Sequence, residues 1–302
     1  MDSLAEEISM LKKEKNAVIL AHYYAHAKVQ QIADYVGDSY YLSKIATKVL
    51  EKTILFCGVY FMAESAKILN PKKQVLIPDM SADCPLAHMV DIGRIKELRE
   101  KYIDLAVVCY INSTAKVKTY ADVCVTSSNA IDIVSALPNK YIYFIPDEHL
   151  GHYVASQVPG KTFLFNDGFC HVHTSISKEN VYNAKITNPR AKVLVHPECR
   201  SEILELADYI GSTSGIIDYA TQSDAEEFII CTEMGILYEL EQKNPNKRFY
   251  FVEQYQLCSN MKRITLEKVY DALYDLKYEV EIEDELLSKA NEPLRRMLEL
   301  VK

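Results

Sequence analysis

The chain has 302 residues, of which 49% are hydrophobic and 25% are charged, and its formal net charge is −8 at pH 7. This length allows one large domain or two to three small ones with buried cores. The negative charge argues against sequence-independent binding to nucleic acid or anionic lipid, because both need a surplus of Lys and Arg.

The N-terminal segment, residues 1–15, is predicted to be a helix. The apolar run at residues 17–21 is too short for the core of a signal peptide, and no stretch approaches the ~20 apolar residues of a membrane helix. We therefore expect a cytoplasmic protein that binds neither nucleic acid nor membrane. In that compartment the eight cysteines are expected to be packed thiols or metal ligands, not disulfides.

Short β-branched runs alternate with longer helical patterns along the rest of the chain. Examples of these runs are residues 17–20, 75–77 and 193–195. The alternation is typical of βαβ units around a buried parallel sheet. The sequence therefore predicts an α/β fold.

Polar residues recur in one register along the chain. Shifting the sequence by 88 residues and then by a further 86 superimposes four sets of positions without a gap. The sets are His22, Tyr110 and His196; Tyr24, Asn112 and Glu198; Asp34, Asp122 and Asp208; and Ser39, Ser127 and Thr213. The alternative is that any α/β segments look alike and that the register is fortuitous, but four gapless matches favour a threefold repeat.

Three strands are expected in each repeat, and a cysteine follows the last of them. These cysteines are Cys84, Cys170 and Cys258, and their separations of 86 and 88 residues match the repeat. We predict a helix at 1–15, repeats at 16–103, 104–189 and 190–263, and a helical tail at 264–302 that packs on the body.

The ends of the strands are the expected place for a ligand, because α/β sheets bind ligands beyond their carboxyl edges. If a pseudo-threefold axis relates the repeats, Cys84, Cys170 and Cys258 meet at one point. Three thiolates around a metal leave a coordination position open, from which the metal can act as a Lewis acid on a substrate oxygen. The alternative for any single cysteine is a packed apolar thiol, which we expect for the other five. These are Cys57, Cys109, Cys124, Cys199 and Cys231.

Other polar residues surround this predicted centre. Glu198 is suited to general-base chemistry. Ser39, Ser127 and Thr213 lie in segments typical of carboxylate or phosphate sites, with a helix N-cap as the alternative role. His173, close to Cys170, is either a substrate contact or a solvated or structural histidine. We expect the three repeated aspartates to serve in turns or helix caps and not in catalysis.

Seven segments of the chain match one known family closely. They are residues 19–24, 37–39, 58–64, 83–85, 110–114, 195–199 and 258–262. In these segments, and along nearly its whole length, the chain resembles the quinolinate synthase family. The resemblance implies three α/β sandwich domains with short parallel sheets around a pseudo-threefold axis. It also implies one [4Fe-4S] cluster, held by Cys84, Cys170 and Cys258, with one open iron.

The resemblance also implies a reaction. Iminoaspartate and dihydroxyacetone phosphate condense to quinolinate for NAD biosynthesis, with loss of phosphate and two waters, and an aspartate oxidase or dehydrogenase supplies the imine. Catalytic roles fall on Glu198, Tyr24, His22 and Tyr110, of which Glu198 and Tyr24 transfer protons. Further contacts to substrates or intermediates are implied for Ser39, Asn112, Ser127, His173, His196 and Thr213.

Two other functions use the same residues. A zinc hydrolase or lyase could bind its ion through the three cysteines. A non-catalytic protein could use the repeat only to build a pocket for a metabolite or a cluster. The predicted position of Glu198 beside an open metal position argues against the second alternative.

Overall fold

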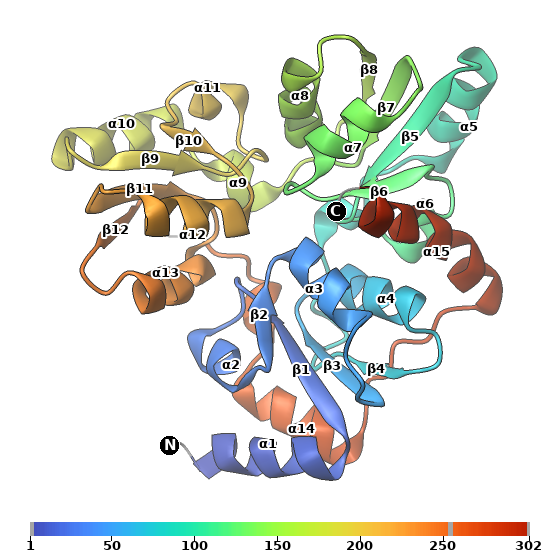
Figure 1. Ribbon diagram of the computed structural model, residues 1–302, viewed down its shortest axis with the longest axis vertical. Helices are drawn as coiled ribbons and strands as arrows, with labels where there is room; N and C mark the ends of the chain where they lie inside the picture. The colour runs from blue at the N-terminus through green and yellow to red at the C-terminus, as the bar shows by residue number, and fades with distance from the viewer. Residues whose placement is uncertain (1–2, 253–255, 301–302) are drawn as a thin grey trace.

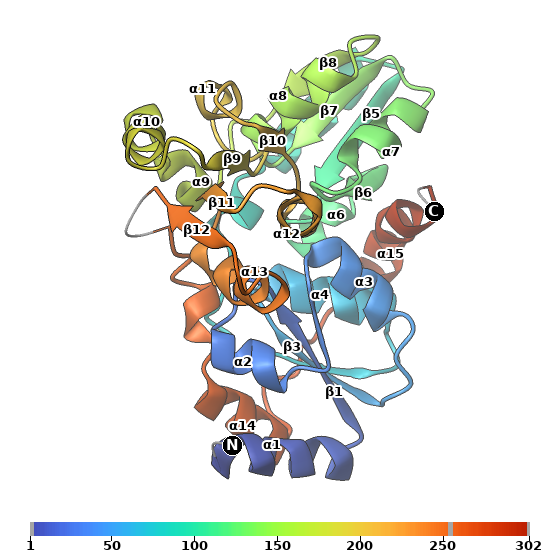
Figure 2. The ribbon, with the colours of Figure 1, turned by 60° about the vertical axis from the view of Figure 1, so that its left-hand side comes forward.

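The computed structural model describes residues 3–252 and 256–300 and contains three four-stranded parallel sheets. Strand order is the same in each sheet: β2-β1-β3-β4, β6-β5-β7-β8 and β10-β9-β11-β12. Figures 1 and 2 show each sheet with its own helices, in three lobes around a common centre. The predicted α/β class with three sandwich domains is confirmed. The boundaries proposed between the repeats stay a prediction, and each sheet with its helices is called a repeat below.

The first repeat consists of β1 (Ala17–His22), α2 (Ala27–Ile32), β2 (Tyr35–Gly37), α3 (Ser39–Ala46), β3 (Thr53–Cys57), α4 (Tyr60–Leu69) and β4 (Gln74–Leu76). A short 3-10 helix, Pro85–His88, follows it. The second repeat consists of α5 (Ile92–Lys101), β5 (Leu105–Tyr110), α6 (Ala115–Lys118), β6 (Val123–Val125), α7 (Ala130–Ala136), β7 (Tyr141–Ile145), α8 (Glu148–Gln157) and β8 (Thr162–Phe165), followed by α9 (His171–Ser175).

The third repeat consists of α10 (Lys178–Thr187), β9 (Lys192–Val195), α11 (Ser201–Leu204), β10 (Tyr209–Ile210), α12 (Thr213–Gln222), β11 (Glu227–Cys231), α13 (Leu237–Lys243) and β12 (Arg248–Phe251). It also contains the 3-10 helices Met234–Ile236 and Met261–Arg263. Outside the repeats lie α1 (Ser3–Glu14), α14 (Leu266–Asp275) and α15 (Asp284–Glu299). No helix in the described parts of the chain is both long and apolar enough to cross a membrane.

The central strands are buried along their length. Every residue of β1, β5, β3 and β11 is buried. Helices cover both faces of such a parallel sheet, so its strands read as continuous apolar runs. These runs are the signal that made the strands predictable.

The sequence predicted three strands per repeat, but each sheet has a fourth, formed by β2, β6 or β10. These strands have only two or three residues, too few to show a sequence period.

The repeated aspartates attach these short strands to the central strand of each sheet. The backbone N–H of each aspartate donates to the carbonyl of one residue in the central strand. The N–H of that strand residue donates in return to Oδ2 of the aspartate. The pairs are Asp34 with Ile19, Asp122 with Val107 and Asp208 with Val193, with N···Oδ2 distances of 2.8, 2.7 and 2.7 Å. The aspartates therefore hold strands together and are not turn or cap residues.

The helices of the C-terminal tail contact two of the repeats. Helix α15 lies across α4 in the first repeat and against α6 and β6 in the second (Figure 1). Its side chains Ala290, Leu294 and Met297 are buried in the hydrophobic core that the first two repeats share. Helix α14 packs with α1 on the other face of the first sheet. The tail thus supplies helical cover to two repeats.

Candidate active site and metal centre

One cavity brings together every site residue predicted from the sequence. Its space not filled by protein atoms, mouth included, is about 770 Å³. The predicted residues that line it are His22, Tyr24, Ser39, Cys84, Tyr110, Asn112, Ser127, Cys170, His173, His196, Glu198, Thr213 and Cys258. They come from all three repeats, which explains why residues far apart in sequence meet here.

His22 and His196 are equivalent residues at the ends of β1 and β9, and both are buried. In each ring Nδ1 accepts a backbone N–H, from Tyr24 at 3.1 Å and from Glu198 at 3.3 Å. A neutral ring must then carry its hydrogen on Nε2. Burial lowers the pKa of His22 to about 4 and that of His196 to about 3. Both rings are therefore neutral near pH 7, and each offers an Nε2–H donor.

A chain of short hydrogen bonds links Glu198 to Tyr24. Glu198 Oε2 lies 2.7 Å from His173 Nδ1, and His173 Nε2 lies 2.9 Å from Thr232 Oγ1. The Thr232 hydroxyl is 2.8 Å from the Tyr24 hydroxyl, which is 2.9 Å from Thr213 Oγ1. This network, called the relay below, joins side chains from all three repeats.

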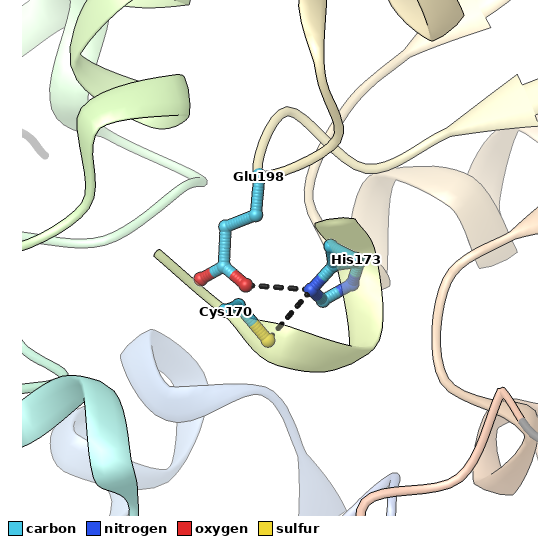
Figure 3. A group of neighbouring side chains, drawn as sticks. All are labelled: Cys170, His173 and Glu198. Atoms are coloured by element: carbon cyan, nitrogen blue, oxygen red, sulfur yellow. Dashed lines mark hydrogen bonds and ion pairs between the residues drawn. The ribbon is translucent and has the colours of Figure 1, made fainter. Parts of the chain in front are cut away.

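Glu198, His173 and Cys170 form the closest group of potential metal ligands in the described part of the chain (Figure 3). Their ligand atoms all lie within 4.8 Å of one another. Figure 3 shows Cys170 and His173 on the same short segment, where His173 belongs to α9, and Glu198 reaching them from a loop of the third repeat. His173 Nδ1 is 3.2 Å from Cys170 Sγ. This burial and these contacts exclude the solvated role that was one alternative for His173.

The protonation states of the acidic groups differ. Burial opposes ionisation of Glu198, but His173 and His196 outweigh it and lower the pKa of this carboxyl. Burial raises the pKa of Tyr24 and of Tyr110, so both phenols hold their protons. Glu198 Oε1 and Asn112 Oδ1 are buried without a hydrogen-bond partner among the described residues. Because both residues line the cavity, a bound ligand with donors would satisfy these atoms.

The three predicted ligand cysteines are half-buried and free of disulfides. All three line the same cavity, so the thiols face a common space. Of these three, only Cys170 belongs to the group of ligand atoms within 4.8 Å of one another. Three thiols that line one cavity are a donor set that an iron–sulfur cluster takes.

A carboxylate holds the backbone at each of these cysteines. The N–H of Cys84 donates to Asp83 Oδ1, that of Cys170 to Asp147 Oδ2 and that of Cys258 to Glu233 Oε1, at 2.7, 3.2 and 3.1 Å. The other five cysteines are fully buried and do not line the cavity, as expected for packed thiols. Among them, Cys199 directs its thiol to the carbonyl of Cys231 at 3.5 Å.

The repeated hydroxyl residues are not helix caps. The caps of α3 and α12 are the preceding residues, Asp38 and Ser212, so Ser39 and Thr213 are the first residues of their helices. The third hydroxyl residue, Ser127, lies before α7, and its Oγ is 3.2 Å from His196 Nε2. Because other residues cap the helices, these hydroxyls remain available to a ligand.

Sequence reasoning missed two parts of the site. Thr232 has no polar equivalent in the other repeats, but it directly follows β11, and its strand-end position was a usable signal. The second part is a buried ion pair, Glu233 Oε1 with Lys262 Nζ at 3.0 Å. Lys262 Nζ also donates to the carbonyl of Tyr24 at 2.6 Å. This pair links the loop of Cys258 to the loop of Tyr24.

Comparisons of the sequence with protein families and with individual proteins point to the same family. Residues 6–299 match the family described as quinolinate synthetase A protein. Quinolinate synthase of Fusobacterium nucleatum subsp. nucleatum is 55% identical over 297 residues, which cover 98% of this chain and 99% of that protein. The quinolinate synthase of Caldicellulosiruptor bescii is 52% identical over 99% of both chains. That of Clostridioides difficile is 52% identical over 98% of both chains.

Proposed function

The chain belongs to the quinolinate synthase family, and from this premise we propose how its residues carry out the reaction of that family. It is an enzyme of NAD biosynthesis that forms quinolinate from two small molecules, iminoaspartate and dihydroxyacetone phosphate, with release of phosphate and two waters. The observation that carries the assignment of residues is the single cavity in which the relay and three cysteine thiols meet.

Cys84, Cys170 and Cys258 hold one [4Fe-4S] cluster with one open iron. One feature of the chain supports this set: the three thiols come from different parts of the sequence and line one cavity. Burial raises the pKa of each thiol, so each holds its proton until a metal displaces it. When bound, the cluster supplies a Lewis-acid iron beside the substrate. The alternative is a single ion held by Cys170, His173 and Glu198.

Glu198 and Tyr24 begin the reaction in opposite protonation states. Because the pKa of Glu198 is lowered and that of Tyr24 is raised, Glu198 is the resting base and Tyr24 the resting acid. A proton taken up by the carboxylate returns to the phenol through His173 and Thr232, since the successive polar atoms from Glu198 to Tyr24 lie 2.7, 2.9 and 2.8 Å apart. Tyr110 and Asn112 position the intermediates from the second repeat.

Neutral donors hold the anionic groups of the substrates. No lysine or arginine lines the cavity among the residues that the structure describes. The donors are instead the Nε2–H groups of His22 and His196 and the hydroxyls of Ser39, Ser127 and Thr213. Their placement on three repeats suits substrates that carry two carboxylates and a phosphate.

The decisive experiment uses protein purified without oxygen. We expect about four irons and four sulfides per chain, negligible zinc, and formation of quinolinate from the two substrates. Glu198→Gln should keep the iron content and lose at least about 100-fold in kcat, because the base is removed while the cysteines remain. One zinc per chain without sulfide would contradict the cluster, and full activity of Glu198→Gln would remove this residue from the mechanism.

Formation of the imine requires a two-electron oxidation of aspartate. We propose that an aspartate oxidase or dehydrogenase performs it, and that the imine reaches this enzyme before it hydrolyses. A coupled assay tests the supply: quinolinate should form from aspartate only when such an enzyme is added, and equal formation without it would contradict the proposal. The cytoplasmic location stays a prediction.

A further inference from the structure

Gln30 on α2 is almost fully buried, 3% exposed, and does not line the cavity. Its Nε2 donates to the carbonyls of Tyr23 at 2.8 Å and Ala25 at 2.9 Å. These two peptide groups flank Tyr24, the end of the relay. The same Nε2 lies 3.1 Å from the carbonyl of Gly235, so it also connects this loop to the third repeat.

Lys118 on α6 makes the same arrangement in the second repeat. It is fully buried, and its Nζ donates to the carbonyl of Ile111 at 3.0 Å and to that of Ser113. These two peptide groups flank Asn112, whose side chain lines the cavity with an unpartnered Oδ1. Like Gln30, Lys118 stays outside the cavity lining.

The two residues are equivalent in the repeat. A shift of 88 residues places Gln30 on Lys118, Tyr24 on Asn112, and each flanking carbonyl on its counterpart. A shift of a further 86 places Lys118 on Leu204, the last residue of α11. The third repeat therefore fills this position with an apolar side chain. Its loop contains Pro197. The N–H of Cys199 donates to the carbonyl of His196 at 3.0 Å, but the first repeat has the equivalent hydrogen bond, from Ala25 to His22 at 2.9 Å, in addition to Gln30.

Leu204 is half-buried and packs on the core of the third repeat, so that repeat has no buried polar side chain at this position. Burying an ammonium or a carboxamide costs free energy unless its donors are satisfied, so Lys118 and Gln30 need a reason beyond packing. The Lys118 ammonium also lies 5.6 Å from the centre of the Phe61 ring, and its charge opposes the rise in pKa that burial causes at the half-buried Glu64. An aromatic ring and a carboxyl group, both of which interact favourably with a cation, therefore lie near the Lys118 ammonium.

We propose that Gln30 and Lys118 are equivalent positioning residues for the reaction. Each clamps the two carbonyls that flank a functional residue, and so sets the direction in which Tyr24 or Asn112 enters the cavity. Neither touches substrate. The inference rests on the proposed function, because Tyr24 and Asn112 are assigned there.

The test compares variants that remove or restore the donor. Lys118→Met and Gln30→Met keep most of the volume and lose the hydrogen bonds, and each should lower kcat/KM for quinolinate formation by up to about 100-fold at unchanged iron content. Lys118→Gln gives the second repeat the donor used by the first, and should recover most of the loss. The affinity of the folded protein for quinolinate, measured by calorimetry, should fall in Lys118→Met and recover in Lys118→Gln.

Lys161→Met is the matched control. Lys161 Nζ also donates to two carbonyls of the second repeat, those of Leu137 at 2.6 Å and Asn139 at 2.8 Å, but it does not line the cavity or flank a site residue. Loss of these two hydrogen bonds in Lys161→Met should lower the melting temperature of the protein. It should leave kcat/KM and the affinity for quinolinate within about 2-fold of wild type.

A Lys118→Met protein that matches Lys161→Met in kcat/KM and quinolinate affinity would overturn the clamp. If Lys118→Met does not fold, Gln30→Met and Lys118→Gln decide the same question, and wild-type values in Gln30→Met would overturn the inference. A wild-type enzyme that forms no quinolinate would overturn the proposed function as well, whereas failure of the clamp alone leaves wild-type quinolinate formation intact.

Discussion

Tyr24 and Glu198 occupy one cavity in opposite protonation states, and the residues between them determine how a proton passes from one to the other. Thr232 is central because its hydroxyl contacts both Tyr24 and His173. It is fully buried, so no surrounding water replaces it at low cost. The chemistry of the cavity therefore depends on a residue outside its lining.

Thr232→Val tests this dependence, because valine keeps the shape and removes the hydroxyl. We expect kcat to fall by at least about 10-fold, with KM changed much less and iron content retained. Steady-state kinetics and metal analysis measure these quantities. Thr53→Val is the control, since Thr53 is also buried and donates to Gln74 at 3.3 Å in the first sheet. Equal kcat values for the two variants would exclude the relay.

Cys199 tests the ligand assignment, because it follows Glu198 directly but packs away from the cavity. Cys199→Ala should retain full iron and sulfide content, whereas Cys258→Ala should lose most of both. Iron and sulfide analysis of the two proteins decides the question. Loss of iron in Cys199→Ala would show that the ligand set is wrong.

At the scale of secondary-structure elements, each sheet repeats one device. An aspartate outside the central strand bonds both backbone groups of a residue within it, and so attaches β2, β6 or β10. Ser39, Ser127 and Thr213 follow these short strands within two or three residues. The aspartates thereby place the hydroxyls of the cavity without taking part in its chemistry.

Asp122→Ala should lower the free energy of unfolding by about 1–3 kcal/mol, because the N–H of Val107 loses its acceptor within the sheet. Activity per folded molecule should fall only slightly. Urea denaturation measures the stability, and Asp132→Ala, at an exposed position on α7, is the control. If both variants are equally stable, the aspartate does not hold the strand.

At the scale of the whole molecule, the repeats are not equally joined. The first two share one hydrophobic core together with α15, whereas the third has cores on each face of its own sheet. Tyr23 of the first repeat packs into one of these cores. The cavity lies among all three repeats, so its geometry depends on how firmly they are held together.

Leu294→Ala tests the role of α15. Leu294 is fully buried between the first two repeats, and its truncation should lower the free energy of unfolding by about 2–5 kcal/mol. Leu50→Ala, at a residue that is 93% exposed, should change it by less than about 0.5 kcal/mol. Urea denaturation compares the two, and equal midpoints would mean that α15 does not hold the repeats together.

The sequence by itself determined the repeat, the α/β class and all the predicted lining residues of the cavity. The reason is that equivalent residues sit at equivalent strand ends, and strand ends of a parallel sheet face a ligand. His22, Glu198 and Cys170 could therefore be placed near one another without coordinates. The short strands β2, β6 and β10 could not be predicted, because two or three residues show no period.

Only the tertiary structure decided what these residues contact. The hydrogen bond from Tyr24 to Thr232 spans 208 residues of sequence, and Thr232 belongs to no repeated set, so no local pattern encodes it. The meeting of Cys84, Cys170 and Cys258 at one cavity likewise depends on how the three repeats pack around it. The sequence marks which residues belong to the site, whereas the packing of the repeats sets the distances on which the chemistry depends.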